Sequence, residues 1–215
     1  MNIQIKLLIE GFGDLFNDGL LSSENVYDDL SNEIFYKYYP KTKQELRTLI
    51  EQLLKERGKD AFLNDIDVSN ITDMSYLFKG LDPHNIDIRY WDMSKVEDMS
   101  YMFFRCENFN CDLSNWDVSN VKNMSYTFFM CLNFDSDVSK WELKNVKEMD
   151  STFYNCQNFK GNGIYKWNIS NVNNYYRIFE HCNFDKSVWF KKKFQQYPYN
   201  KKLLGNYLNE KLYES

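Results

Sequence analysis

Hydrophobic residues in the middle of the chain recur with a period of about 25 residues. The clearest markers are Trp91, Trp116, Trp141 and Trp167, with Ile66 in the same register one period earlier. Other apolar residues keep step with them, and in the central period these are Leu113, Val118, Val121, Met124, Phe128 and Cys131. A fixed period of this length, kept over roughly 120 residues, predicts turns of chain stacked as a solenoid.

The spacing inside one period predicts one short strand and one short helix. Trp116 and Val118 flank a polar residue, and this alternation is typical of a strand with two side chains facing inward. The apolar residues between positions 121 and 131 are three or four residues apart, which is helical spacing. We therefore predict an α/β fold: a solenoid of five turns, each with one short parallel strand and one short helix, and helical caps at both ends.

Three phrases from successive periods resemble a known repeat: DVSNITDMSYLF, WDMSKVEDMSYMF and FNCDLSNWDVSNVKNMSYTF. They are similar to the repeat of the BspA-like bacterial surface-protein family, which is about 25 residues long and related to leucine-rich repeats. The resemblance implies a right-handed, leucine-rich-repeat-like α/β solenoid that serves adhesion or protein binding in bacteria, their phages and some protists. It implies no catalytic activity, and it carries no family-wide binding residues that could be transferred to this chain.

Changes of pattern divide the chain into four predicted segments. Residues 1–40 form a peripheral N-terminal segment, and residues 41–62 form a capping helix with a lead-in. Residues 63–185 hold the BspA-like repeats, and residues 186–215 form a helical C-terminal cap. The terminal segments are expected to cover the ends of the stack, because an uncovered end would expose apolar surface.

The capping helix has clear sequence signals at both ends. Thr42 and Glu45 form a T-x-x-E capping box, and Gly58 supplies a stop. Its apolar stripe consists of Leu46, Leu49, Ile50, Leu53 and Leu54. This stripe either covers the first turn or binds a partner. The same choice stays open for residues 1–40, which either pack on the solenoid or form an arm that docks on a partner.

Composition limits the classes of partner and the compartment. The formal net charge of -5 disfavours nucleic acid as the main partner. No apolar run is long enough to span a membrane, and the start of the chain lacks the cleavage site of a secretory signal, so we predict no signal peptide. We expect a cytoplasmic or particle-associated protein. The abundance of Asn, Lys and Tyr suggests an AT-rich genome, as in a bacterium or its phage.

The cysteines are expected to be buried thiols. The chain has 5 Cys, and four of them share one column of the repeat, where a small apolar side chain fits the core. Neighbouring turns could bring two of them within bonding distance, so a disulfide is the alternative. The spacing of a zinc site is absent and the two histidines lie apart, so neither a metal nor a cofactor is predicted.

The predicted strand face carries a recurrent acidic column next to the tryptophans, made of Asp67, Asp92, Asp117 and Glu142. Stacked carboxylates repel one another unless they are hydrogen-bonded or matched by cations. Each carboxylate therefore either accepts hydrogen bonds from a neighbouring Ser or the backbone, or forms a strip for a basic partner. The position just before each tryptophan changes from acidic to basic along the repeats, and it adds Tyr90, Lys140 and Lys166 to the predicted face. Such a charge gradient would orient a bound partner along the solenoid.

The predicted helical face carries aromatic residues at two outward positions: Tyr101, Phe104, Tyr126, Phe129 and Tyr154. Charged residues border them in the first and last periods. If these rings are exposed, they form an apolar patch with a charged rim, as many protein interfaces do. The alternative is that the N-terminal segment or the C-terminal tail covers them.

These patterns favour a non-enzymatic module that recognises another protein. One version is an inhibitor of a host or defence protein, encoded by a phage or a mobile element. The alternative is a structural component of a virion or cell surface, and self-association would favour it. A further alternative, an enzyme or carbohydrate-binding protein, has little support, because none of the common catalytic motifs occurs.

Overall fold

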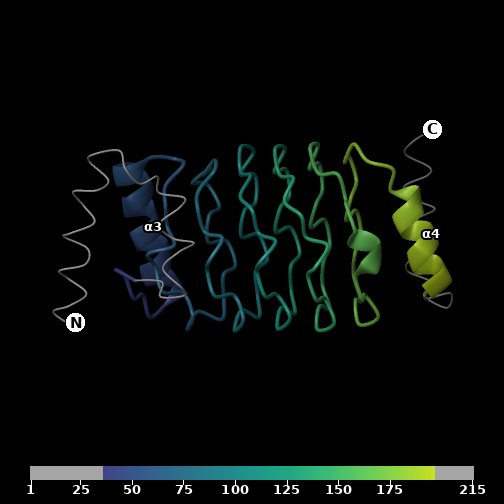
Figure 1. Ribbon diagram of the computed structural model, residues 1–215, viewed down its shortest axis with the longest axis horizontal. Helices are drawn as coiled ribbons and strands as arrows, with labels where there is room; N and C mark the ends of the chain where they lie inside the picture. The colour runs from purple at the N-terminus through teal and green to yellow at the C-terminus, as the bar shows by residue number, and fades with distance from the viewer. Residues whose placement is uncertain (1–35, 197–215) are drawn as a thin grey trace, which may run out of the picture. The chain divides into compact units, whose positions relative to one another are not determined.

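The computed structural model describes residues 36–196. They contain helix α3 (Lys43–Arg57), the 3₁₀ helix η1 (Ile164–Lys166) and helix α4 (Ser187–Gln196), which are joined by turns and bends (Figure 1). Most of the predicted N-terminal segment and the end of the predicted C-terminal cap lie outside the described residues. The division of the chain into four segments is therefore not tested.

Helix α3 has the caps that its sequence predicts. The Thr42 side chain accepts a hydrogen bond from the Glu45 N–H at 3.1 Å. The Glu45 carboxylate, however, accepts from the N–H of Lys41 at 2.7 Å, one residue earlier than in a standard capping box. Gly58, with φ of 84°, ends the helix and donates its N–H to the Leu54 carbonyl. The buried side chains are Leu46, Ile50, Leu53 and Leu54.

Cationic side chains near α3 bond to carbonyl groups of the chain that follows. Arg47 donates from Nη1 to the carbonyls of Leu77 at 2.6 Å and Lys79 at 3.0 Å. Lys59 donates from Nζ to the carbonyl of Leu81. Backbone acceptors at this end would otherwise lack partners, and buried acceptors without partners are destabilising. The helix therefore supplies polar contacts as well as apolar cover.

The prediction of five strand-and-helix turns is wrong. Within residues 36–196 the structure has no named strand, and backbone pairing of the strand type is limited to isolated parallel bridges. Those that lie 25 or 26 residues apart in the middle of the chain are Asp73–Asp98, Asp98–Asn123, Asn123–Glu148 and Glu148–Asn174. The described helices are α3, α4 and η1, and none lies where the repeated short helices were expected. The described part of the chain is therefore not a strand-and-helix solenoid. It consists of turns and bends joined by isolated bridges, together with α3, η1 and α4.

Turns replace the predicted strand. The N–H of Trp116 donates to the Leu113 carbonyl at 3.1 Å, and the N–H of Val121 donates to the Val118 carbonyl at 3.0 Å. Bonds between residues three apart close β-turns. The inward side chains of Trp116 and Val118 thus come from two consecutive turns, and the alternation in the sequence did not distinguish this arrangement from a strand.

Left-handed residues prevent the predicted helix. Tyr126 has φ of 59° and Met130 has φ of 58°, so one residue in four leaves the right-handed helical region. The N–H groups of Tyr126, Phe128 and Met130 donate to carbonyls further along the chain, at 2.8 to 2.9 Å. A helix would have directed these N–H groups four residues back. Equivalent positive φ angles occur at Tyr101, Arg105, Ser151, Asn155, Arg177 and His181.

Hydrogen bonds join stretches of chain about 25 residues apart, and each such stretch is called a layer below. For example, the N–H of Met99 donates to the Asn123 carbonyl at 3.0 Å, and that of Met124 to the Glu148 carbonyl at 2.9 Å. Figure 1 shows the corresponding loops side by side between α3 and α4. Bonds of this kind satisfy the backbone groups that a continuous sheet would otherwise satisfy.

Stacked aromatic rings fill the interior of the layers. Phe103 lies between Phe78 and Phe128, with ring centroids 5.0 and 5.6 Å apart, and the Phe128 and Phe153 centroids are 5.4 Å apart. These four rings are fully buried. The burial of such large apolar rings stabilises the folded chain.

Helix α4 covers the last described layer. Trp189 and Phe190 are buried, and the Trp189 ring packs edge-on against Phe179 at 5.1 Å. Lys193 is also buried and donates from Nζ to the Trp167 carbonyl. Burial lowers the pKa of this ammonium group to about 8. Over residues 36–196, neither α3 nor α4 has the length and apolar character of a membrane-spanning helix.

Candidate functional site

The acidic column beside the tryptophans is hydrogen-bonded locally. Asp67, Asp92 and Asp117 each accept a hydrogen bond at Oδ1 from the N–H of the Ser two residues later, at 2.9 to 3.0 Å. Asn168 accepts the same bond from Ser170 at 3.1 Å. This contact is an Asx-turn, which fixes the chain between two turns. Because Asn can replace Asp here, the column serves the fold through its oxygen atom and not only through its charge.

The electrostatics of the column agree with a structural role. Hydrogen bonds from Ser119 lower the pKa of Asp117, because they stabilise its ionised form. Asp67 and Asp92 also face Tyr36, whose pKa is raised by burial and then by these two carboxylates. Glu142 is exposed and accepts no such bond from the described residues, since its longer side chain does not form an Asx-turn. The hydrogen bonding of the column thus differs between its Asp residues and Glu142, although all of them are acidic.

The predicted charge gradient is weakened at its acidic end. Asp65 begins this column, and its carboxylate forms an ion pair with Arg57 at 2.9 Å. Tyr90, Lys140 and Lys166 are exposed, and Lys166 belongs to η1. With Asp65 already paired, the free charge of this column comes mainly from its two lysines.

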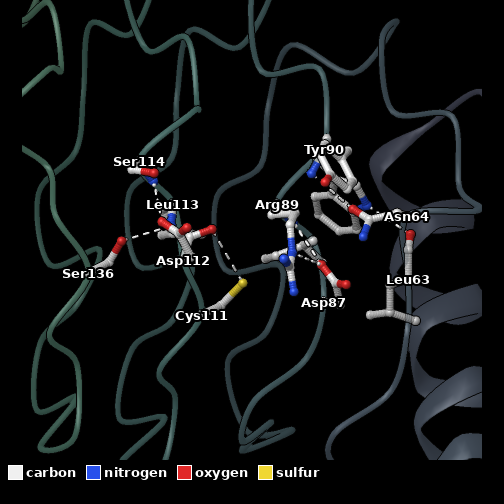
Figure 2. A network of polar contacts seen from close by, with 12 residues as sticks. Leu63, Asn64, Asp87, Arg89, Tyr90, Cys111, Asp112, Leu113, Ser114 and Ser136 are labelled. Atoms are coloured by element: carbon white, nitrogen blue, oxygen red, sulfur yellow. Dashed lines mark hydrogen bonds and ion pairs between the residues drawn. The ribbon is translucent and has the colours of Figure 1, made fainter. Parts of the chain in front are cut away.

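Figure 2 shows how Tyr90 is held at the edge of this column. The N–H of Tyr90 donates to Oδ1 of Asn64 at 3.0 Å, and Asn64 is buried. Arg89 pairs with Asp87 at 3.0 Å between its Nε and the carboxylate. One layer further, the N–H of Leu113 donates to Ser136, and the N–H of Ser114 donates to Asp112. The Tyr90 backbone is therefore fixed, while its ring remains 41% exposed.

The aromatic residues predicted on the other face come together in two columns. In the first, Tyr101 stacks between Tyr76 and Tyr126, with ring centroids 4.6 and 4.7 Å apart and interplanar angles of 6° and 10°. In the second, Phe129 stacks between Phe104 and Tyr154, with centroids 5.0 and 4.6 Å apart. We call these six rings the aromatic ladder.

The two columns of the ladder touch within each layer. The Tyr101 and Phe104 centroids are 5.4 Å apart with the rings tilted by 47°, and the Tyr126 and Phe129 centroids are 5.6 Å apart with a tilt of 45°. The five predicted rings are half-buried, and Tyr76 is 45% exposed. Contacts between rings in this range of distances are attractive. The ladder is therefore an ordered surface whose outer edge faces solvent.

Charged residues close both ends of the ladder. The ammonium group of Lys79 lies 5.0 Å from the centroid of Tyr76 and 5.3 Å from that of Phe104, close enough for cation–π attraction. At the other end, Arg177 and Glu180 form an ion pair at 3.0 Å in the registers of the two columns. The His181 ring meets Tyr154 edge-on at 5.2 Å. An apolar surface with a charged boundary results.

A carboxylate lies beside the tyrosine hydroxyls. Burial raises the pKa of Tyr126, and a hydrogen bond with Asp150 raises it further. Burial, Tyr76 and then Asp150 raise the pKa of Tyr101 in the same direction. Both hydroxyls therefore stay protonated at neutral pH and can donate hydrogen bonds.

The predicted site residues did not include Tyr76, Lys79 and Asp150, although Tyr76 and Lys79 were expected at the border of the patch in the first period. Their signals are present in the sequence. Tyr76 and Lys79 occupy the registers of Tyr101 and Phe104 one period earlier, and Asp150 replaces a Ser that recurs in the preceding periods. The prediction left them out because it selected positions by aromatic identity in the middle periods.

The cysteines lie in the interior of the described part of the chain. All five are buried free thiols, as the sequence predicted. Cys131 and Cys156 donate from Sγ to the carbonyls of Phe103 and Phe128 at 3.1 and 3.0 Å. Burial raises their pKa well above the usual value, so the reactive thiolate is scarce. Within residues 36–196 no group of three His, Cys, Asp or Glu side chains could hold a metal ion.

One protein-family model matches the chain over residues 48–162 and again over residues 72–196. Its description is "Mycoplasma protein of unknown function, DUF285". No curated protein and no solved structure matches the chain. The matched residues include the aromatic ladder, so the ladder lies in the part of the chain that the family model covers.

Proposed function

We propose that this chain, which belongs to the family of Mycoplasma proteins of unknown function called DUF285, is a non-enzymatic module that binds another protein. The binding surface in this proposal is the aromatic ladder. The observation that carries it is the in-register stacking of six partly exposed rings, closed at both ends by charged side chains. Aromatic residues are enriched at protein interfaces and often dominate their binding energy.

The interior of the protein does not require the ladder. The fully buried column that contains Phe103 and Phe128 already fills each layer. Tyr101 and Tyr126 lie outside that column and are only half-buried. Contiguous exposed apolar patches bordered by polar residues often mark sites of protein interaction. The ladder is therefore better explained by a partner than by packing.

The acidic column offers a weaker surface. Its carboxylates at Asp67, Asp92 and Asp117 already accept local hydrogen bonds, so a basic partner would gain less from them. The resemblance to BspA-like repeats, which implies adhesion or protein binding, supports the same class of function. The inhibitor and the structural component remain predictions, and the identity of the partner would separate them.

A site-specific photocrosslinker tests this proposal. Benzoylphenylalanine is introduced in place of Phe129, inside the ladder, and in a second protein in place of Tyr90, which is exposed elsewhere. Crosslinking in cells of the encoding organism should give a discrete protein adduct from position 129 and none from position 90. The captured protein is then purified and its affinity for the unmodified chain is measured.

Two variants complete the test. Tyr126→Ala should weaken binding of the purified partner by at least about tenfold, as expected for a central aromatic contact. Tyr90→Ala should leave the affinity unchanged. Equal adducts from both positions, or a Tyr126→Ala protein that binds normally while circular dichroism shows it folded, would contradict the proposal.

A further inference from the structure

We propose that the ladder's partner is a proline-rich segment in the polyproline II conformation, with a basic residue that faces Asp150. This inference rests on the proposed function and adds the chemistry of the partner. Three observations carry it: the spacing of the rings, the donors that the ladder presents, and the carboxylate beside them.

The spacing of the ladder fits polyproline II. Two successive steps of the tyrosine column, 4.6 and 4.7 Å, correspond to about 9.3 Å, the length of one polyproline II turn of three residues. A helix repeats about every 5.4 Å and so drifts by more than 1 Å over the same distance. The same face of a strand repeats about every 6.6 Å, which matches neither one step nor two. A polyproline II segment along the tyrosine column would therefore present the same face to the rings once every two layers.

The hydrogen-bonding groups are complementary as well. The backbone N–H groups of Tyr76, Tyr101 and Tyr126 already donate to the next layer at 2.8 to 3.0 Å, so these three residues offer no free N–H to an added strand. What the tyrosine column offers is aromatic surface with the hydroxyls of Tyr76 and Tyr101 as donors, because the Tyr126 hydroxyl already donates to Asp150. Polyproline II has no internal hydrogen bonds, so all its carbonyls can accept, and proline has no N–H that would need a partner.

Asp150 sets the charge of the partner. Its carboxylate accepts hydrogen bonds from the hydroxyl of Ser151 at 3.3 Å and from that of Tyr126, and among the described residues no Lys or Arg forms an ion pair with it. Lys122 is the basic residue closest in sequence to the position one period before Asp150, and it is already paired with Glu97 at 2.8 Å. A carboxylate beside an apolar surface favours an Arg or Lys on the partner.

Fluorescence anisotropy with labelled synthetic peptides tests the proposal on the full chain. The probe is one arginine followed by nine prolines. The first comparison peptide keeps the arginine but replaces the prolines by alternating Gly and Ser, and the second keeps the prolines but replaces the arginine by glutamate. The arginine–proline peptide should bind at least about tenfold more tightly than either comparison peptide.

Variants locate the site. The double variant Tyr101→Phe, Tyr126→Phe keeps the rings and removes two hydroxyls, and it should weaken binding of the arginine–proline peptide by about tenfold or more. Asp150→Asn should weaken it by about fivefold, with a smaller effect at high salt. Tyr90→Phe, a matched loss of one exposed hydroxyl, should leave the affinity unchanged. Circular dichroism confirms that each variant is folded.

Several results would overturn the inference: no binding of the arginine–proline peptide at millimolar concentration, equal binding of the Gly/Ser peptide, or undiminished binding by the double variant. A concentration-dependent dimer that the ladder variants abolish would assign the surface to a second copy instead. If the peptide fails to bind while benzoylphenylalanine at position 129 still captures a discrete protein, only the partner's chemistry is wrong. If both fail, the proposed function falls with it.

Discussion

The indole N–H of Trp116 donates to the carbonyl of Ile88 at 3.0 Å, across the boundary between two layers. The same bond recurs from Trp91 to Leu63, from Trp141 to Leu113 and from Trp167 to Val138. Each indole is at most 3% exposed, so the bond is made without competition from water. The tryptophans therefore fix the register of successive layers as well as filling the interior.

Trp116→Phe should lower the free energy of unfolding by about 1 kcal/mol more than a matched change that removes no hydrogen bond. The extra loss stays small because the Ile88 carbonyl also accepts from the Trp91 N–H at 3.1 Å. The matched change is Trp189→Phe, because the Nε1 of this buried indole has no hydrogen-bond partner within residues 36–196. Urea unfolding of both variants measures the difference. Equal losses would mean that the indole bonds contribute nothing beyond packing.

The thiols give a second prediction. A thiol reagent such as dithionitrobenzoate should react with fewer than one cysteine in the native protein and with all five after unfolding, because all five are buried free thiols. Burial raises the pKa of Cys106 and Cys111 to about 12, which keeps both thiols protonated at neutral pH. Fast reaction of two thiols in the native state would contradict this burial. A count of three after unfolding would reveal a disulfide.

The sequence identified the buried side chains better than the backbone that carries them. Val121, Met124, Phe128 and Cys131 were predicted to face inward, and all four are buried. The repeat of these residues every 25 positions indicated a core position without specifying the backbone conformation there. Spacing of three and four residues, however, is produced here by consecutive turns with a left-handed residue every four positions, and the prediction assigned it to a helix.

The candidate site shows the same limit. The 25-residue period correctly places Tyr101 against Tyr126, because residues one period apart lie in neighbouring layers. The hydrogen bonds that engage Asp92 and Asp117 were one of two open alternatives, since a D-x-S pattern fits both an Asx-turn and an exposed acidic strip. Only the backbone angles decide between them. The charged residues at the ends of the ladder were expected from the sequence, but the contacts of Lys79 with two rings depend on side-chain conformations that no spacing specifies.

Gly80 held a signal for the left-handed backbone. It has φ of 79° and lies in the register of Arg105, whose φ is 59°. Gly80→Ala should lower the free energy of unfolding by about 1 kcal/mol, because the left-handed region is unfavourable for a residue with a Cβ. The added Cβ would meet no atom within 4 Å, so steric overlap cannot explain the loss.

Arg105→Gly is the reciprocal control. It removes the same backbone strain from the next layer, while Gly makes the unfolded chain more flexible. Because these two effects oppose each other, the temperature of thermal unfolding should stay close to that of the parent. A Gly80→Ala protein as stable as the parent would argue that these turns relax easily into another conformation.

The Asx-turns predict different effects for two substitutions at one position. Asp117→Asn should preserve stability at pH 7, because an Asn oxygen can accept the Ser119 N–H as Asn168 accepts that of Ser170. Asp117→Ala removes the acceptor and should cost about 0.5 kcal/mol, a low value because the side chain is exposed to solvent.

The two substitutions also separate charge from hydrogen bonding as pH changes. The folded-state pKa of Asp117 is lowered, so the unfolded chain binds the proton first and the aspartate's contribution is present above the unfolded pKa of about 3.9. That contribution is lost as pH falls through the folded-state pKa. Urea unfolding between pH 7 and pH 3 should therefore show a smaller decline for Asp117→Asn than for the parent. An identical decline would mean that the carboxylate charge has no part in the turn.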